Sequence, residues 1–91
     1  MLERIKQFQN SACAWIYEQP SAPMFSADRN ILSELIPELK ALDKEESALY
    51  LKQLLVSNNC PVVEVSRKQL CKLTIDIEFL IIAQTLRRER H

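Results

Sequence analysis

The side chains that could carry out acid–base or nucleophilic chemistry in this chain do not form a recognisable catalytic set. The single histidine is His91, the last of 91 residues, and a frayed chain end cannot hold catalytic geometry. Without a positioned histidine, Ser-His and Cys-His nucleophilic pairs and most zinc sites are excluded. We therefore predict that the chain is not an enzyme and that it binds no cofactor and no metal ion.

Carboxylates occur close together at two places in the sequence. Glu45 and Glu46 are adjacent, so they point in different directions on a helix and are expected to face solvent. Asp76 and Glu78 lie two residues apart inside an apolar segment. A carboxylate in apolar surroundings needs a partner. We therefore expect Asp76 and Glu78 at the rim of the apolar surface, each paired with a lysine or an arginine.

The three cysteines, Cys13, Cys60 and Cys71, include no C-x-x-C pair. An odd number of cysteines with no secretory signal indicates a reducing compartment, where free thiols usually pack as small core residues. No run of about 18 apolar residues is present, as a transmembrane helix would require. These features predict a cytoplasmic protein with no membrane contact.

The segment from Ser66 to Arg90 is the most apolar part of the chain and has the clearest helix start. Ser66 is a good N-cap, and Gln69, three residues later, completes a capping box. Val65 and Leu70 occupy the hydrophobic-staple positions on either side of the cap. Arginines near the end of the segment suit the negative pole of the helix dipole. These signals predict one long C-terminal helix.

This predicted helix is apolar on two opposite sides. At 100° per residue, its first face consists of Leu70, Leu73, Ile77, Leu80, Ile81 and Gln84. Its second face consists of Cys71, Ile75, Phe79, Ile82 and Leu86. A helix that is apolar nearly all round must be covered on both sides. All of these residues except Cys71 and Gln84 are therefore candidates for a homodimer interface.

A strand is the alternative structure for part of this segment. Leu73, Ile75, Ile77 and Phe79 alternate with polar residues, which is the pattern of a half-buried strand. The extended segment Val62–Val65 could pair with it, giving an α+β fold with a short C-terminal hairpin. The alternation ends at Phe79, however, and the apolar run continues without a turn residue, so we favour the helix.

The absence of glycine is the strongest feature of the composition. Hairpin turns and phosphate-binding loops depend on residues that tolerate positive φ, so a P-loop or a dinucleotide-binding motif is excluded. Helices joined by proline, asparagine, serine and aspartate fit the sequence best. We therefore predict an all-α fold: one helical domain over residues 1–91, built as a small bundle of about four helices around the long C-terminal helix.

The upstream helices are expected from apolar spacing and capping residues. The first spans Leu2 to Glu18 and is followed by a connector, residues 19–26, that contains two prolines. Ser26 or Asp28 caps a second helix, which should stop or kink at Pro37. Asp43 is expected to cap a third helix, with Glu46 at the capping-box position.

The net charge and the distribution of charged residues bear on which partners the chain can bind. The net charge is zero, which argues against a broadly electrostatic nucleic-acid binder. Acids outnumber bases by two between residues 27 and 56, and bases outnumber acids by two between 57 and 91, so antiparallel pairing of these regions would join opposite charges. The basic side chains available to a partner protein or a nucleic acid are Arg67, Lys68, Lys72, Arg87, Arg88 and Arg90.

The predicted function is that of a small cytoplasmic interaction protein. It would form a homodimer through its last helix and act as an adaptor or regulator by binding another, unidentified protein. The alternative is a small dimeric DNA-binding transcriptional regulator. Residues 66–73 resemble the start of a helix-turn-helix unit, but acidic residues follow where the turn and the recognition helix should be.

Overall fold

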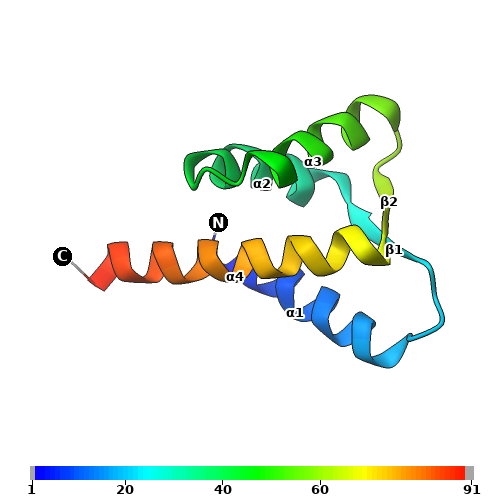
Figure 1. Ribbon diagram of the computed structural model, residues 1–91, viewed down its shortest axis with the longest axis horizontal. Coiled ribbons are helices and arrows are strands. Elements are labelled where there is room, and N and C mark those ends of the chain that lie inside the picture. Colours follow the sequence, from blue (N-terminus) through cyan, green and yellow to red (C-terminus); the bar gives the residue numbers. More distant parts are fainter. Residues whose placement is uncertain (1, 90–91) are drawn as a thin grey trace.

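A computed structural model describes residues 2–89, with side chains as far as Arg87. Along the chain, these residues form α1 (Leu2–Glu18), β1 (Met24–Asp28), α2 (Arg29–Ala41), α3 (Glu45–Ser57), β2 (Val62–Ser66) and α4 (Arg67–Glu89). The prediction of a mostly helical chain is confirmed. A simple helical bundle is not what forms, because a two-stranded sheet joins the helices at one end (Figure 1).

The elements follow the order helix–strand–helix twice. β1 and β2 pair in antiparallel fashion, with Phe25 opposite Val65 and Ala27 opposite Val63. Two further backbone bonds extend the ladder, from the Arg29 amide to the Pro61 carbonyl (2.9 Å) and from the Arg67 amide to the Pro23 carbonyl (3.0 Å). The sheet thus places the start of α2 at one end of the ladder and the start of α4 at the other.

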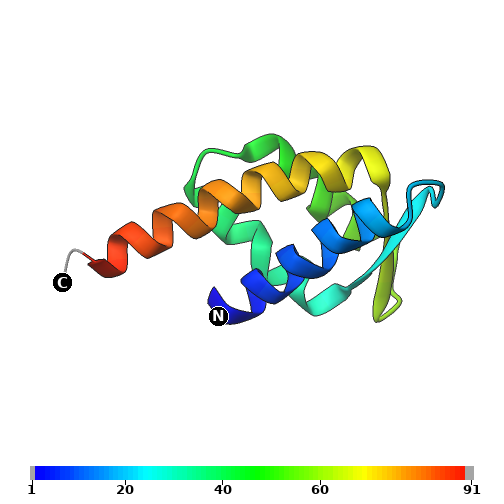
Figure 2. The same cartoon turned by 90° about the horizontal axis from the view of Figure 1, so that it is seen from below.

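The helices form two packed pairs, α1 with α4 and α2 with α3, and Figure 2 shows α1 and α4 side by side. The core lies between the pairs and against the inner face of the sheet. Each large apolar side chain buried there stabilises the fold by roughly 1.5–3 kcal/mol. The largest fully buried side chains are Ile5, Leu32, Leu35, Leu39, Leu51, Val63, Val65, Leu70, Ile77 and Leu80.

The α+β alternative is confirmed only in part. A small antiparallel sheet is present, but it is not a C-terminal hairpin, because β2 pairs with β1 and residues 73–79 are helical. β1 begins within the segment, residues 19–26, that was predicted to be a connector. Phe25 explains why this segment is ordered: its ring packs edge-on against Trp15 and Phe8, with centroid distances of 5.3 and 6.0 Å.

Two boundaries in the middle of the chain differ from those predicted. Pro37 does not stop α2, which continues to Ala41, since Leu35 and Leu39 on either side of it are fully buried and this packing outweighs the missing hydrogen bond. Asp43 does not cap α3 either. It adopts a positive φ of 60° in the turn, and the N-cap is Lys44, whose side chain makes no capping hydrogen bond.

Other boundaries agree with the sequence-based predictions. α1 begins and ends where its apolar spacing places it. Asp28 is the N-cap of α2, and its carboxylate accepts a 2.8 Å bond from the Asn30 amide. Ser66 precedes α4, and its hydroxyl accepts from the Gln69 amide at 3.4 Å. The long C-terminal helix is therefore confirmed as an element.

Candidate functional site

One apolar face of α4 is covered by its own chain. Leu70, Leu73, Ile77 and Leu80 are buried among residues of the other elements, and Ile81 is partly buried beside them. α1 supplies much of this cover, and Gln9 of α1 binds the Thr74 carbonyl on α4 through its side-chain amide (2.8 Å). Four of these five candidate interface residues therefore belong to the core of the monomer, where a second chain cannot reach them, and Ile81 lies at its edge.

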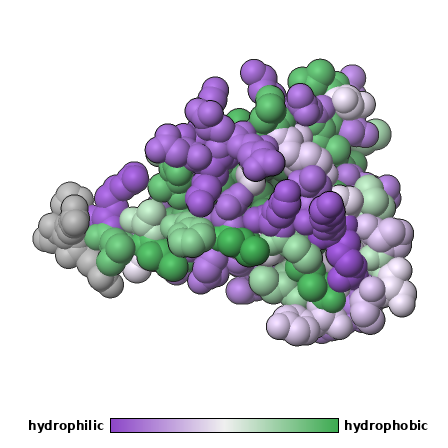
Figure 3. Space-filling view, viewed as in Figure 1, coloured by the Kyte–Doolittle hydropathy of each residue, from purple (hydrophilic) through white to green (hydrophobic). Residues whose placement is uncertain are grey.

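The opposite face of α4 is exposed along its length. Ile75, Phe79, Ile82 and Leu86 have 60, 53, 48 and 56% of their surface accessible. We call these four residues the α4 stripe. Their spacing of four, three and four residues is that of the a and d positions of a heptad, the pattern that places side chains in one seam between paired helices. Figure 3 shows the apolar surface following α4 towards its C-terminal end.

A shallow apolar groove of about 310 Å³ runs beside the α4 stripe. Its far wall is the turn between α2 and α3, where Lys44 lies over the ring of Phe79, with its ammonium nitrogen 4.7 Å from the ring centroid. The sequence contained no signal for this wall, because a contact between residues 42–44 and α4 exists only in the folded chain. The groove is lined by Leu42, Lys44, Phe79, Ile82, Ala83 and Leu86.

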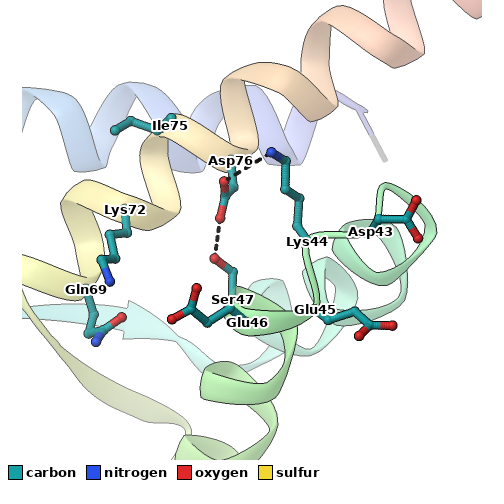
Figure 4. Close-up of a pocket in the computed structure, with 9 residues that line it drawn as sticks. All are labelled: Asp43, Lys44, Glu45, Glu46, Ser47, Gln69, Lys72, Ile75 and Asp76. Atoms are coloured by element: carbon teal, nitrogen blue, oxygen red, sulfur yellow. Dashed lines mark hydrogen bonds and ion pairs between the residues drawn. The ribbon is translucent and has the colours of Figure 1, made fainter.

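A polar pocket of about 350 Å³ separates the start of α3 from α4 (Figure 4). The Ser47 hydroxyl donates to the Asp76 carboxylate, and the Lys44 ammonium group lies 3.9 Å from the same carboxylate. The expected pairing of Asp76 with a lysine is therefore confirmed. Glu78 instead accepts a hydrogen bond from the amide of Gln9 at 3.3 Å. The contacts of Asp76 hold the start of α3 against α4, and the contact of Glu78 joins α1 to α4.

The pocket in Figure 4 brings together acids and a few basic or neutral groups, and Asp76 is held by bonds within the chain. Glu45 and Glu46 are exposed, as expected for a solvated face. Among the described residues, no three or more His, Cys, Asp or Glu side chains are placed to hold a metal ion. Cys13, Cys60 and Cys71 are free thiols, and Cys60 is exposed.

Arg67 is engaged within its own chain. Its guanidinium group donates to the carbonyls of Ala22 (3.1 Å), Ile16 (3.2 Å) and Gln19, and it lies 4.5 Å from the ring centroid of Trp15. This arginine therefore ties the end of α1 to the start of α4. The sequence placed it among the groups available to a partner and gave no signal of this role.

The other basic candidates lie at the two ends of α4. Lys68 and Lys72 are exposed one turn apart near its start, and Arg87 is exposed near its end. The side chain of Arg88, and Arg90 as a whole, lie outside the part of the chain that the structure describes. The exposed cations are thus separated by the α4 stripe and by the acidic residues Asp76 and Glu78.

Comparisons with protein-family models, with curated protein sequences and with solved structures found no match to this chain. A membrane span would need a longer or more apolar helix than any that residues 2–89 form.

Proposed function

We propose that this chain is a small cytoplasmic, non-enzymatic interaction protein that forms a homodimer through the α4 stripe and acts as an adaptor or regulator by binding another protein. The observation that carries the proposal is the exposure of four large apolar side chains on one face of a long helix. Contiguous apolar surface on a monomer usually marks an interaction site. The a and d spacing of the α4 stripe favours another helix as the group that covers it.

The expected strength of this homodimer is modest. Covering four half-exposed apolar side chains contributes about 1 kcal/mol for each side chain on each copy. Association costs on the order of 4–15 kcal/mol in lost freedom of motion. At the lower limit of this cost, about 4 kcal/mol remains, which corresponds to a dissociation constant on the order of millimolar, so monomer and dimer exchange in solution.

The DNA-binding alternative has weaker support. Lys68 and Lys72 could contact phosphates, but Arg67 is already bound to three carbonyls of its own chain. Asp76 and Glu78 follow on the same helix, where they would repel a phosphate backbone. A gel mobility shift with duplex DNA at low salt that weakens steeply as salt is added would favour this alternative over the adaptor.

Dilution of the isotopically labelled protein in an NMR titration tests the homodimer. Amide signals of Ile75, Phe79 and Ile82 should move with protein concentration, because their environment changes on pairing. Leu49 and Val56 of α3 provide the control, since they are also exposed apolar side chains but lie on another helix. Concentration-dependent shifts confined to α3, or no shifts at all, would refute the α4 stripe as the site of association.

A further inference from the structure

The sheet has an open edge on each side, because within the described residues β1 and β2 pair only with each other. The bond from the Arg29 amide to the Pro61 carbonyl continues the register of the ladder by one residue. Hydrogen-bonded pairs in an antiparallel ladder recur at every second residue. Counting back from Arg29, Ala27 and Phe25 are therefore the residues of β1 that bond to β2, and the alternate residues turn their backbone groups away from it.

Met24 and Ser26 are two of these alternate residues, and their backbone amide and carbonyl groups face the outer edge of β1. These groups make no backbone hydrogen bond within the described part of the chain. Both residues are exposed. The outer edge of β1 thus presents donors and acceptors at a spacing of two residues, which is the spacing at which an extended backbone presents its own groups.

A groove of about 290 Å³ lies between this edge and α1. Residues 25–28 of β1 form one wall, and Arg4, Gln7 and Ser11 of α1 contribute to the other. Figure 2 shows β1 between α1 and β2, so the outer edge of β2 faces away from α1. The β1 edge therefore combines free backbone groups with a helix wall beside them, the combination that lets a groove hold both the backbone and the side chains of an added strand.

The floor of this groove is apolar. Phe8 and Ile31 line it and are 8% and 5% exposed, and the ring of Phe25 packs against that of Phe8. A strand added beside β1 would point alternate side chains towards this floor and the others towards solvent. The groove therefore suits an extended segment with apolar side chains at alternate positions.

The charged side chains of the groove are already engaged. Arg4 forms an ion pair with Glu34, and the carboxylate of Asp28 caps α2. The polar side chains of Gln7 and Ser11 are uncharged. Backbone pairing and apolar contacts, rather than recognition of a charged side chain, must therefore supply the binding.

We propose that an extended segment of a partner protein adds to β1 as a third strand, bonds to the backbone of Met24 and Ser26, and places alternate apolar side chains between β1 and α1. This inference rests on the protein binding in the proposed function and names its site and the kind of segment bound. It does not require self-association, because the groove beside the α4 stripe and this one share no lining residue.

Peptide binding tests the proposal. A random peptide library displayed on phage is selected on the immobilised chain, and the recovered peptides are synthesised and their affinities measured by fluorescence anisotropy. We expect apolar residues at alternate positions. Each backbone amide of a recovered peptide is then methylated in turn, which removes one donor and leaves every side chain in place. Binding should weaken about tenfold at alternate amides and little at those between, because only alternate amides face β1.

Two proline variants locate the binding edge. Ser26→Pro removes an outward N–H of β1, and the fold should persist because proline is tolerated where the N–H of an edge strand faces solvent. Glu64→Pro is the matched control, since Glu64 lies directly opposite Ser26 and the same change falls on the outer edge of β2. Ser26→Pro should weaken peptide binding about tenfold or more, and Glu64→Pro should leave it within about twofold, with circular dichroism checking both folds.

The results decide between this edge and its alternatives. Weak binding by Ser26→Pro together with the alternating methylation pattern supports the proposal, and the methylation pattern still decides if the variant does not fold. Recovery of no peptide, equal binding by the two proline variants, or a uniform response to methylation would overturn it. Movement of the Ser26 amide signal on dilution of the chain alone would assign the edge to a second copy and overturn it too. Self-association through the α4 stripe is measured separately, by the signals of α4 itself.

Discussion

Arg67 shows how one side chain can join segments that are far apart in the sequence. Its backbone amide extends the sheet ladder to Pro23, and its guanidinium group binds carbonyls at the end of α1 and in the following loop. It also covers one face of Trp15. The sequence identified the helix start at Ser66, but a basic residue after an N-cap gives no indication of which distant carbonyls it will meet.

Replacement of Arg67 by alanine should lower the free energy of unfolding by about 2–3 kcal/mol, because several charge-assisted hydrogen bonds and a cation–π contact are lost. Arg67→Lys should recover only part of the loss, since one ammonium group cannot reach three carbonyls in the guanidinium geometry. Urea denaturation followed by circular dichroism measures the effect. The exposed neighbour provides the control, and equal destabilisation by Lys68→Ala would contradict this role for Arg67.

Asp28 is a second residue whose role can be tested by substitution, and its contact is local. Its side chain accepts from the Asn30 amide at the start of α2, so Asp28→Ala should cost about 1 kcal/mol of unfolding free energy. Asp28→Ser should retain most of the stability, because serine is also a good N-cap. The same urea denaturation measures both variants, and indistinguishable midpoints for alanine and serine would argue against capping.

At the scale of elements, the sequence predicted what depends on short-range pattern. α1 and α4 follow from apolar spacing and capping residues within each segment. β1 does not, because a five-residue strand between a proline-containing loop and a helix resembles a connector until its partner is known. That partner, β2, lies more than thirty residues later. Pro37 shows the same dependence, since tertiary packing keeps α2 continuous across it.

The two apolar faces of α4 show which part of the candidate site the sequence could not predict. Both are apolar, so the sequence indicated that each needed cover but not which one the chain itself would supply. The other helices decide this, because α1 packs against the face that contains Ile77 and leaves the face that contains Ile75 exposed. Nine predicted interface residues therefore divide into five that are at least partly buried in the monomer and the four of the α4 stripe.

A matched pair of aspartate substitutions tests this division. Ile77 is 0% exposed, so Ile77→Asp should prevent stable folding by burying an unpaired charge. Ile75→Asp, half a turn away on the same helix, should leave the far-ultraviolet circular dichroism spectrum and the unfolding midpoint of the monomer nearly unchanged. If the two variants unfold alike, the assignment of buried and exposed faces is wrong.

At the scale of the whole molecule, the arrangement of helices leaves the α4 stripe uncovered. Two packed helix pairs and a short sheet bury a continuous core, so the monomer is complete as a fold. The four side chains of the α4 stripe lie outside that core. They leave apolar surface in solvent, which costs solubility unless another surface covers it. Self-association of α4 is the account proposed for this exposed surface.

Sedimentation equilibrium of wild type and Ile82→Asp, from tens of micromolar to a few millimolar, tests this account most directly. Ile82 lies in the middle of the α4 stripe and is 48% exposed, so the substitution should spare the fold and place a charge in the stripe. The wild-type mass should rise with concentration from 10.6 kDa towards twice that value, while Ile82→Asp stays at 10.6 kDa. A wild-type mass of 10.6 kDa at every concentration would contradict the account.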